Sequence, residues 1–146
     1  MSRLIRLTAI FATMVVTAFA HVTVQPKQSM PGATQRYALR VPTEKFVPTV
    51  RVEVEFPSNL NVTAFELKTG WKIEQKRDGS GRITRVTLTG SLAPAETTQF
   101  YFTARNPVNE GPLVFKAVQI YEDGTKSEWT GGEGSKTPAP VVELKK

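Results

Sequence analysis

The chain has 146 residues, with 19 Lys and Arg against 13 Asp and Glu, and a formal net charge of +6. It contains no cysteine and one histidine, which excludes disulfides, thiolate metal sites and cysteine nucleophiles. The basic residues are scattered rather than clustered with aromatic side chains, so the sequence does not indicate nucleic-acid binding.

The first 20 residues have the pattern of a secretory signal peptide. Arg3 and Arg6 form a basic region, and an apolar run follows that is shorter than the about 20 residues a membrane span needs. Ala18 and Ala20 then place small residues at the positions that signal peptidase recognises. We therefore predict cleavage after Ala20 and an exported protein, periplasmic or secreted, that retains residues 21–146 and no membrane anchor. An uncleaved anchor is the alternative.

The remaining sequence predicts strands and turns throughout. Apolar residues alternate with polar ones, or form short runs between turn signals, at 22–24, 37–41, 50–56, 62–66, 71–75, 83–88, 100–104, 113–121, 127–129 and 141–142. The glycine-rich segment 77–81 and the pair Asp123-Gly124 predict hairpin turns. The alternation changes phase between Ile83 and Val86, which predicts a β-bulge.

About eight strands with short turns between them are typical of an antiparallel β-sandwich, either immunoglobulin-like or cupredoxin-like. No internal repeat or linker divides residues 21–146, so one domain is expected. The segment 131–140 is rich in Gly, Ser, Thr and Pro and is expected to be loose.

Cleavage after Ala20 would make His21 the first residue of the mature chain. Its free α-amine and its imidazole Nδ1 could then bind one metal ion together, so that the second coordination step is intramolecular. The amine has an ordinary pKa of about 7.7–8.0, so removing its proton at pH 7 costs only about 1 kcal/mol. A simple exposed terminus without a metal is the alternative interpretation.

The ligand chemistry favours copper(II). Two nitrogens with carboxylate or water oxygens suit a divalent late transition metal, and copper(II) has the highest affinity in that series. Copper(I) prefers sulfur ligands, and residues 21–146 contain no cysteine and one methionine, Met30. A blue-copper centre needs two histidines and a cysteine, which this chain lacks.

Several segments resemble those of the YcnI-like family of exported bacterial copper-binding domains. They occur in the order of that family over nearly all of residues 21–146, and they are HVTVQP at 21–26, GA at 32–33, LRVPTE at 39–44, GW at 70–71, FYFTARNP at 100–107 and WTG at 129–131. The resemblance implies a β-sandwich that holds one copper(II) ion per chain in a single-histidine brace. It also implies a copper chaperone or buffer that exchanges copper with other periplasmic or membrane proteins.

The same resemblance assigns the site residues. His21 corresponds to the histidine that supplies amine and imidazole nitrogens, Glu44 to the oxygen ligand, and Trp129 to the tryptophan beside the ion. On the residues alone, Glu44 has the alternatives Glu122 and Glu128, and it is also a candidate for a simple solvated charge. Trp129 taken alone would be interpreted as a core or edge aromatic, as Trp71 is.

Catalysis is not expected. The copper brace of oxidative polysaccharide-cleaving enzymes needs a second histidine, and no serine has a histidine partner other than His21. The competing hypothesis is an exported immunoglobulin-like module that binds another protein without a metal.

Overall fold

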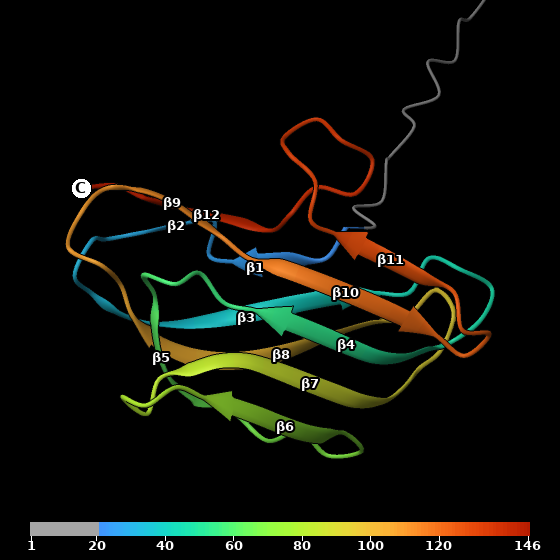
Figure 1. Ribbon diagram of the computed structural model, residues 1–146. Helices are drawn as coiled ribbons and strands as arrows, with labels where there is room; N and C mark the ends of the chain where they lie inside the picture. Colours follow the sequence, from blue (N-terminus) through green and yellow to red (C-terminus); the bar gives the residue numbers. More distant parts are fainter. Residues whose placement is uncertain (1–20) are drawn as a thin grey trace, which may run out of the picture.

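The computed structural model describes residues 21–146, which form twelve β-strands and no helix (Figure 1). The predicted signal peptide lies outside the described residues. In the first half of the chain the strands are β1 (Thr23–Gln25), β2 (Gln28–Ser29), β3 (Thr34–Pro42), β4 (Thr49–Glu55), β5 (Asn61–Phe65) and β6 (Lys72–Arg77). In the second half they are β7 (Ile83–Leu92), β8 (Thr97–Arg105), β9 (Gly111–Val114), β10 (Lys116–Tyr121), β11 (Lys126–Trp129) and β12 (Val141–Leu144).

Two antiparallel sheets face each other and a smaller sheet closes one end. The first sheet has the order β1-β3-β8-β5 and the second the order β11-β10-β4-β7-β6. The third has the order β2-β12-β9, with β12 parallel to β2 and antiparallel to β9. The all-β sandwich expected from the alternating pattern is therefore confirmed, with more strands than the eight expected because several are only two to four residues long.

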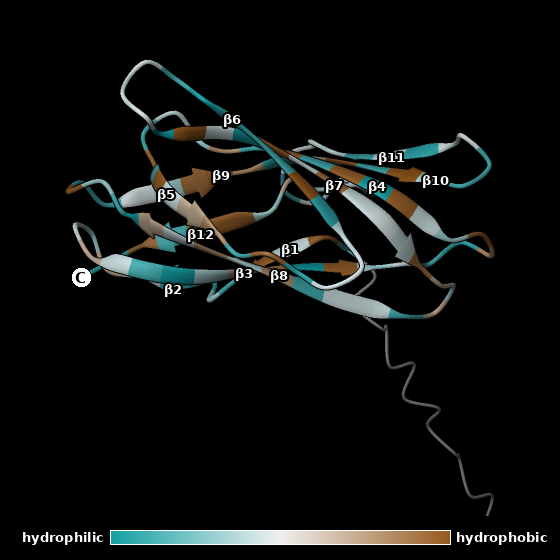
Figure 2. Cartoon of the chain, turned by 90° about the horizontal axis from the view of Figure 1, so that it is seen from below, coloured by the Kyte–Doolittle hydropathy of each residue, from teal (hydrophilic) through white to brown (hydrophobic). Residues whose placement is uncertain are grey.

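The core lies between the two large sheets and is rich in aromatic rings. Figure 2 shows hydrophobic and hydrophilic residues alternating along β4 and β7, as expected for strands with one buried face. The fully buried Phe102 on β8 packs against Phe56 with ring centroids 5.1 Å apart, which joins the two sheets. Tyr37 stacks on the same Phe102 ring at 5.3 Å, and its hydroxyl donates a 2.6 Å hydrogen bond to Asn106 Oδ1. Burial of this ring raises the pKa of Tyr37.

The bulge predicted in β7 is confirmed. Lys76 pairs with Arg85 and Arg77 with Ile83, so the backbone of the intervening Thr84 is skipped in the pairing register with β6. A second bulge, between Val62 and Ala64 in β5, was not predicted. It turns Ala64 outward and buries Phe65 instead, so the expected 62–66 alternation is wrong beyond Val62.

The single strand expected over 113–121 is two strands in different sheets. β9 pairs with β12, whereas β10 pairs with β4 and β11, and the chain changes sheets at Phe115. Leu113, Phe115, Ala117, Gln119 and Tyr121 are nevertheless all buried. Alternation continues across the crossing because both sheets turn the same side of the chain toward the core, and a period-2 pattern cannot reveal such a break.

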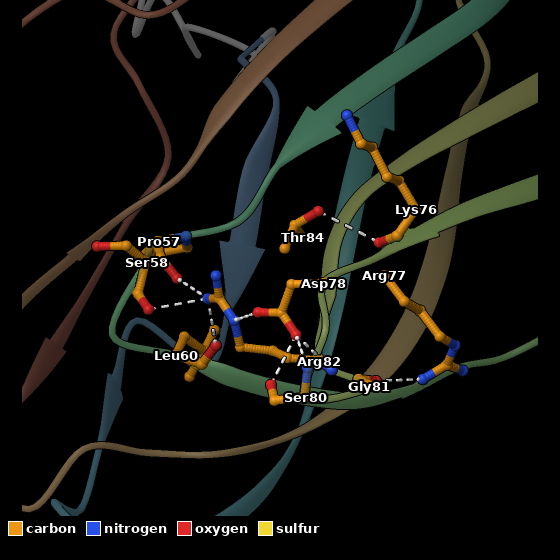
Figure 3. Close-up of polar contacts among 10 residues, drawn as sticks. All are labelled: Pro57, Ser58, Leu60, Lys76, Arg77, Asp78, Ser80, Gly81, Arg82 and Thr84. Atoms are coloured by element: carbon orange, nitrogen blue, oxygen red, sulfur yellow. Dashed lines mark hydrogen bonds and ion pairs between the residues drawn. The ribbon is translucent and has the colours of Figure 1, made fainter.

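The predicted hairpin turn between β6 and β7 is confirmed and is organised around Asp78 (Figure 3). One carboxylate oxygen accepts hydrogen bonds from the Ser80 hydroxyl at 2.6 Å and from the amides of Ser80 and Arg82. The other carboxylate oxygen accepts from Arg82 Nε at 3.1 Å. The Ser80 hydroxyl and the Arg82 side chain together lower the pKa of Asp78 from 3.8 to about 2.

This depressed pKa predicts an acid-sensitive turn. Because the folded pKa lies below the ordinary value, the carboxylate stabilises the fold above about pH 4, and this contribution is lost as the pH falls from 3.8 toward 2. An NMR titration of the Asp78 carboxyl carbon is expected to give a midpoint near 2. Ser80→Ala should raise this midpoint, since it removes the largest cause of the shift. A midpoint near 3.8 in the parent protein would contradict the prediction.

Candidate metal centre

The predicted site residues His21 and Trp129 meet where the edges of the two large sheets come together. β1 is an edge strand of the first sheet, β11 is an edge strand of the second, and the two lie on the same side of the molecule (Figure 1). His21 lies two residues before the first residue of β1, and Trp129 ends β11. Their ring centroids are 5.4 Å apart with an interplanar angle of 51°. This separation is a direct aromatic contact.

Trp129 is fixed by a buried hydrogen-bond network. Its side chain is 3% exposed, and its Nε1 donates a 3.1 Å hydrogen bond to Gln119 Oε1. Gln119, which is completely buried on β10, donates through Nε2 to the Pro42 carbonyl at 2.8 Å and to Thr49 Oγ1 at 2.7 Å. The Thr49 hydroxyl also lies 2.7 Å from that of Thr43. A buried network in which each member has a partner favours one arrangement of its side chains.

Sequence reasoning did not assign Gln119 to the site. The available signal was its position, because Gln119 is the polar residue on an inward face otherwise formed by Leu113, Phe115, Ala117 and Tyr121. A buried amide needs hydrogen-bond partners, and here the partners belong to β11 and to the end of β3. Gln119 thus connects the tryptophan to the segment that leads to Glu44.

Glu44 lies at the same end of the sandwich as His21. Extending the β1–β3 register by two residues beyond the Thr23–Arg40 pair places His21 opposite Pro42, two residues before Glu44. Glu44 is exposed, and its carboxylate forms no hydrogen bond or ion pair within residues 21–146. The pKa of the Tyr121 hydroxyl is raised by burial and, in addition, by the negative charge of Glu44. The role of Glu44 as an oxygen ligand stays a prediction.

The two alternative carboxylates lie at β11 and at the turn that precedes it. Glu128 pairs with Val118 on the outward face of β11, opposite to the face that carries Trp129, and its carboxylate lies 3.3 Å from Lys126 Nζ. Glu122 is exposed at the start of the β10–β11 turn, where its amide donates to the Pro48 carbonyl. Glu44 therefore stays the predicted oxygen ligand, and Glu122 stays its exposed alternative.

The described residues add two further observations. No three or more His, Cys, Asp or Glu side chains gather into a potential metal site within 21–146, and the predicted set uses only two such side chains together with a main-chain amine. Over the same residues, no helix has the length and apolar character needed to cross a membrane.

The two facing antiparallel sheets form an immunoglobulin-like β-sandwich, and the contact between His21 and Trp129 lies at its edge. A crystal structure of an uncharacterized protein from Nocardia farcinica with an immunoglobulin-like fold superposes with a TM-score of 0.73 and 27% identity, over 87% of this chain and 99% of that chain. A cohesin module from a Clostridium perfringens family 33 glycoside hydrolase shares the fold, with a TM-score of 0.56 and 12% identity over 86% of this chain and 94% of that one.

Sequence comparison places the chain in a family. Residues 21–144 match the family described as Domain of unknown function (DUF1775), and the chain belongs to it. The chain is also 33% identical over 129 residues to the copper-binding protein CutI of Bacillus subtilis (strain 168). The match covers 87% of this chain and 63% of that relative, so the chain spans less than two thirds of its length.

Proposed function

We propose that this protein binds copper(II) at the N-terminus of its mature, exported form and acts as a copper chaperone or buffer rather than as an enzyme. The observation that carries the proposal is the contact between the chain's one histidine and a buried tryptophan, at 5.4 Å between ring centroids. The 33% identity to a protein named as copper-binding supports the choice of metal.

The residues present fit copper(II) chemically. After cleavage, the His21 α-amine and imidazole Nδ1 form a chelating pair of nitrogens, and Glu44 supplies a carboxylate oxygen. Copper is the cargo here, and the protein's task is to hold it and release it. Glu44 is exposed and has no protein partner within residues 21–146, so its carboxylate is available without breaking an existing contact.

In the proposed site, Trp129 is a rigid aromatic neighbour of His21. The hydrogen bond from Nε1 to Gln119 fixes the orientation of the indole, and the His21 ring packs against this fixed indole. An aromatic ring within about 6 Å of a cation attracts it through the negative face of the ring. The arrangement therefore favours a positively charged ion next to the imidazole.

The proposal is tested by adding one residue before His21. If the α-amine is a ligand, a mature chain carrying an extra Gly at its start should bind copper(II) more weakly, because the nitrogen of His21 is then a peptide amide. Its electron paramagnetic resonance spectrum should also change, because one nitrogen donor is lost. The matched control is a chain of the same length with one Gly added after Lys146. If the extended and parent chains give the same spectrum, the amine is not a ligand and the proposed brace is wrong.

A further inference from the structure

A surface cleft of about 520 Å³ lies away from the candidate metal centre and shares no residue with it. It opens beside the ends of β4, β6 and β7 and the junction of β9 with β10. Its volume falls within the range of about 300–1,000 Å³ that small-molecule sites occupy. Four cationic side chains line it, with one carboxylate among them: Lys76, Arg82, Arg85, Lys116 and Glu55.

Strand register explains why the positive charges gather there. Lys116 on β10 pairs with Glu55 on β4, Glu55 with Arg85 on β7, and Arg85 with Lys76 on β6. Directly opposed residues project from the same face of a sheet, so these four side chains form one row across the outer face. Within the row, Arg85 and Glu55 neutralise each other through a 3.0 Å ion pair.

Elsewhere on this outer face the carboxylates have cationic partners. Three ion pairs cover it, each between neighbouring side chains of a single strand: Arg51–Glu53 at 2.8 Å, Lys72–Glu74 at 2.8 Å and Lys126–Glu128 at 3.3 Å. Lys76 and Lys116, in contrast, form no ion pair within residues 21–146. The uncompensated positive charge of the face is therefore concentrated at the cleft.

Arg82 gives the cleft a rigid donor. Its Nε binds Asp78, and one terminal nitrogen donates to three main-chain carbonyls, those of Pro57, Ser58 and Leu60, at 2.9–3.1 Å (Figure 3). The other terminal nitrogen carries no contact in this figure. These hydrogen bonds hold the guanidinium in place before any ligand arrives, and the Arg82 side chain is 20% exposed to solvent. A fixed guanidinium in the same cleft as two exposed lysines is suited to a phosphate, whose oxygens accept several charge-assisted hydrogen bonds.

We propose that this cleft binds an oxyanion of the phosphate class, either free or as the head of a larger molecule, through Arg82, Lys76 and Lys116. Because Arg85 is paired with Glu55 and Arg82 with Asp78, the two uncompensated charges are those of Lys76 and Lys116. A phosphate group, which carries up to two negative charges near neutral pH, balances both, whereas a single carboxylate balances one. The uncharged polar residues Ser58 and Asn59 also line the cleft.

The test uses metal-free protein and inorganic pyrophosphate as the probe, measured by isothermal titration calorimetry at fixed ionic strength. We expect saturable binding that weakens at least tenfold in the double variant Lys76→Gln, Lys116→Gln. Arg82 is left intact because its side chain also binds Asp78 within the β6–β7 turn and links this turn to the carbonyls of Pro57 and Leu60. The control, Lys72→Gln with Lys126→Gln, removes the same charge from the same face but outside the cleft, and should weaken binding less than threefold.

A second arm identifies the source of the phosphate. Co-sedimentation compares the binding of the same three proteins, the parent and the two double variants, to vesicles containing phosphatidylglycerol and to vesicles of phosphatidylcholine alone. Selective loss of vesicle binding in the cleft variant, but not in the control, assigns the site to a lipid headgroup; pyrophosphate binding without vesicle binding assigns it to a free phosphate. Absence of both, or equal weakening in the two double variants, would overturn the proposal. Because no copper is present, the result is independent of the His21 site.

Discussion

Replacing His21 by Ala should reduce the copper(II) affinity of the mature protein by at least roughly a hundredfold. Loss of an outer-shell partner already weakens metal sites by about 10–100-fold, and the imidazole is proposed as a direct ligand. The stability of the metal-free protein should change by less than about 1 kcal/mol, because His21 lies at the chain end and offers the fold mainly its ring contact with Trp129. Competition titration of copper(II) against a chelator, together with thermal unfolding of the metal-free variant, measures both quantities.

Two carboxylate variants make this experiment more specific. Glu44→Gln should weaken binding, because an amide oxygen is a poorer ligand than a carboxylate. Glu128→Gln is the matched control, since its carboxylate lies on the outer face and is paired with Lys126. If His21→Ala bound copper(II) as tightly as the parent, the site would be elsewhere. If the parent itself showed no stoichiometric binding, the metal-free interaction module would be the better hypothesis.

Most of the fold could be predicted because the core is built from alternating strands. Two alternating segments were predicted to end at Pro42 and Pro57, and Asp123-Gly124 was predicted to form a hairpin turn. These predictions use only neighbouring residues in the sequence, and the structure confirms them. The errors came from events that leave no trace in hydrophobic alternation. The β5 bulge reverses the direction of Ala64, and the change of sheets at Phe115 keeps every second residue buried.

The site was only partly predictable for a related reason. His21 and Trp129 were singled out from the cleavage pattern and a family resemblance. The structure brings them into contact across 107 intervening residues, because two sheet edges meet there. The role of Gln119, which connects Trp129 to the Pro42 carbonyl, could not be recognised, because it depends on which carbonyl and which indole lie within hydrogen-bond reach. Such distances follow from tertiary packing, and one-dimensional patterns do not encode them.

The connecting role of Gln119 predicts a large loss of stability when it becomes apolar. Gln119→Leu should lower the free energy of unfolding by about 2–4 kcal/mol, because each buried polar group left without a partner costs about 1–3 kcal/mol. The groups affected are Trp129 Nε1, the Pro42 carbonyl and the Thr49 hydroxyl, of which the last keeps its contact with Thr43. Urea unfolding followed by far-ultraviolet circular dichroism measures the loss.

A double-mutant cycle separates this role from simple packing. Trp129→Phe removes the indole donor, so Gln119→Leu should cost less in that background, with a coupling energy of about 0.5–3 kcal/mol. The matched cycle combines Gln119→Leu with Trp71→Phe, because Trp71 packs on Phe100 at 5.0 Å and has no bond to Gln119; its coupling should be near zero. Additive costs in the Trp129 cycle would show that the amide does not hold the indole. In that case the orientation of Trp129 against His21 would have to come from the surrounding apolar contacts alone.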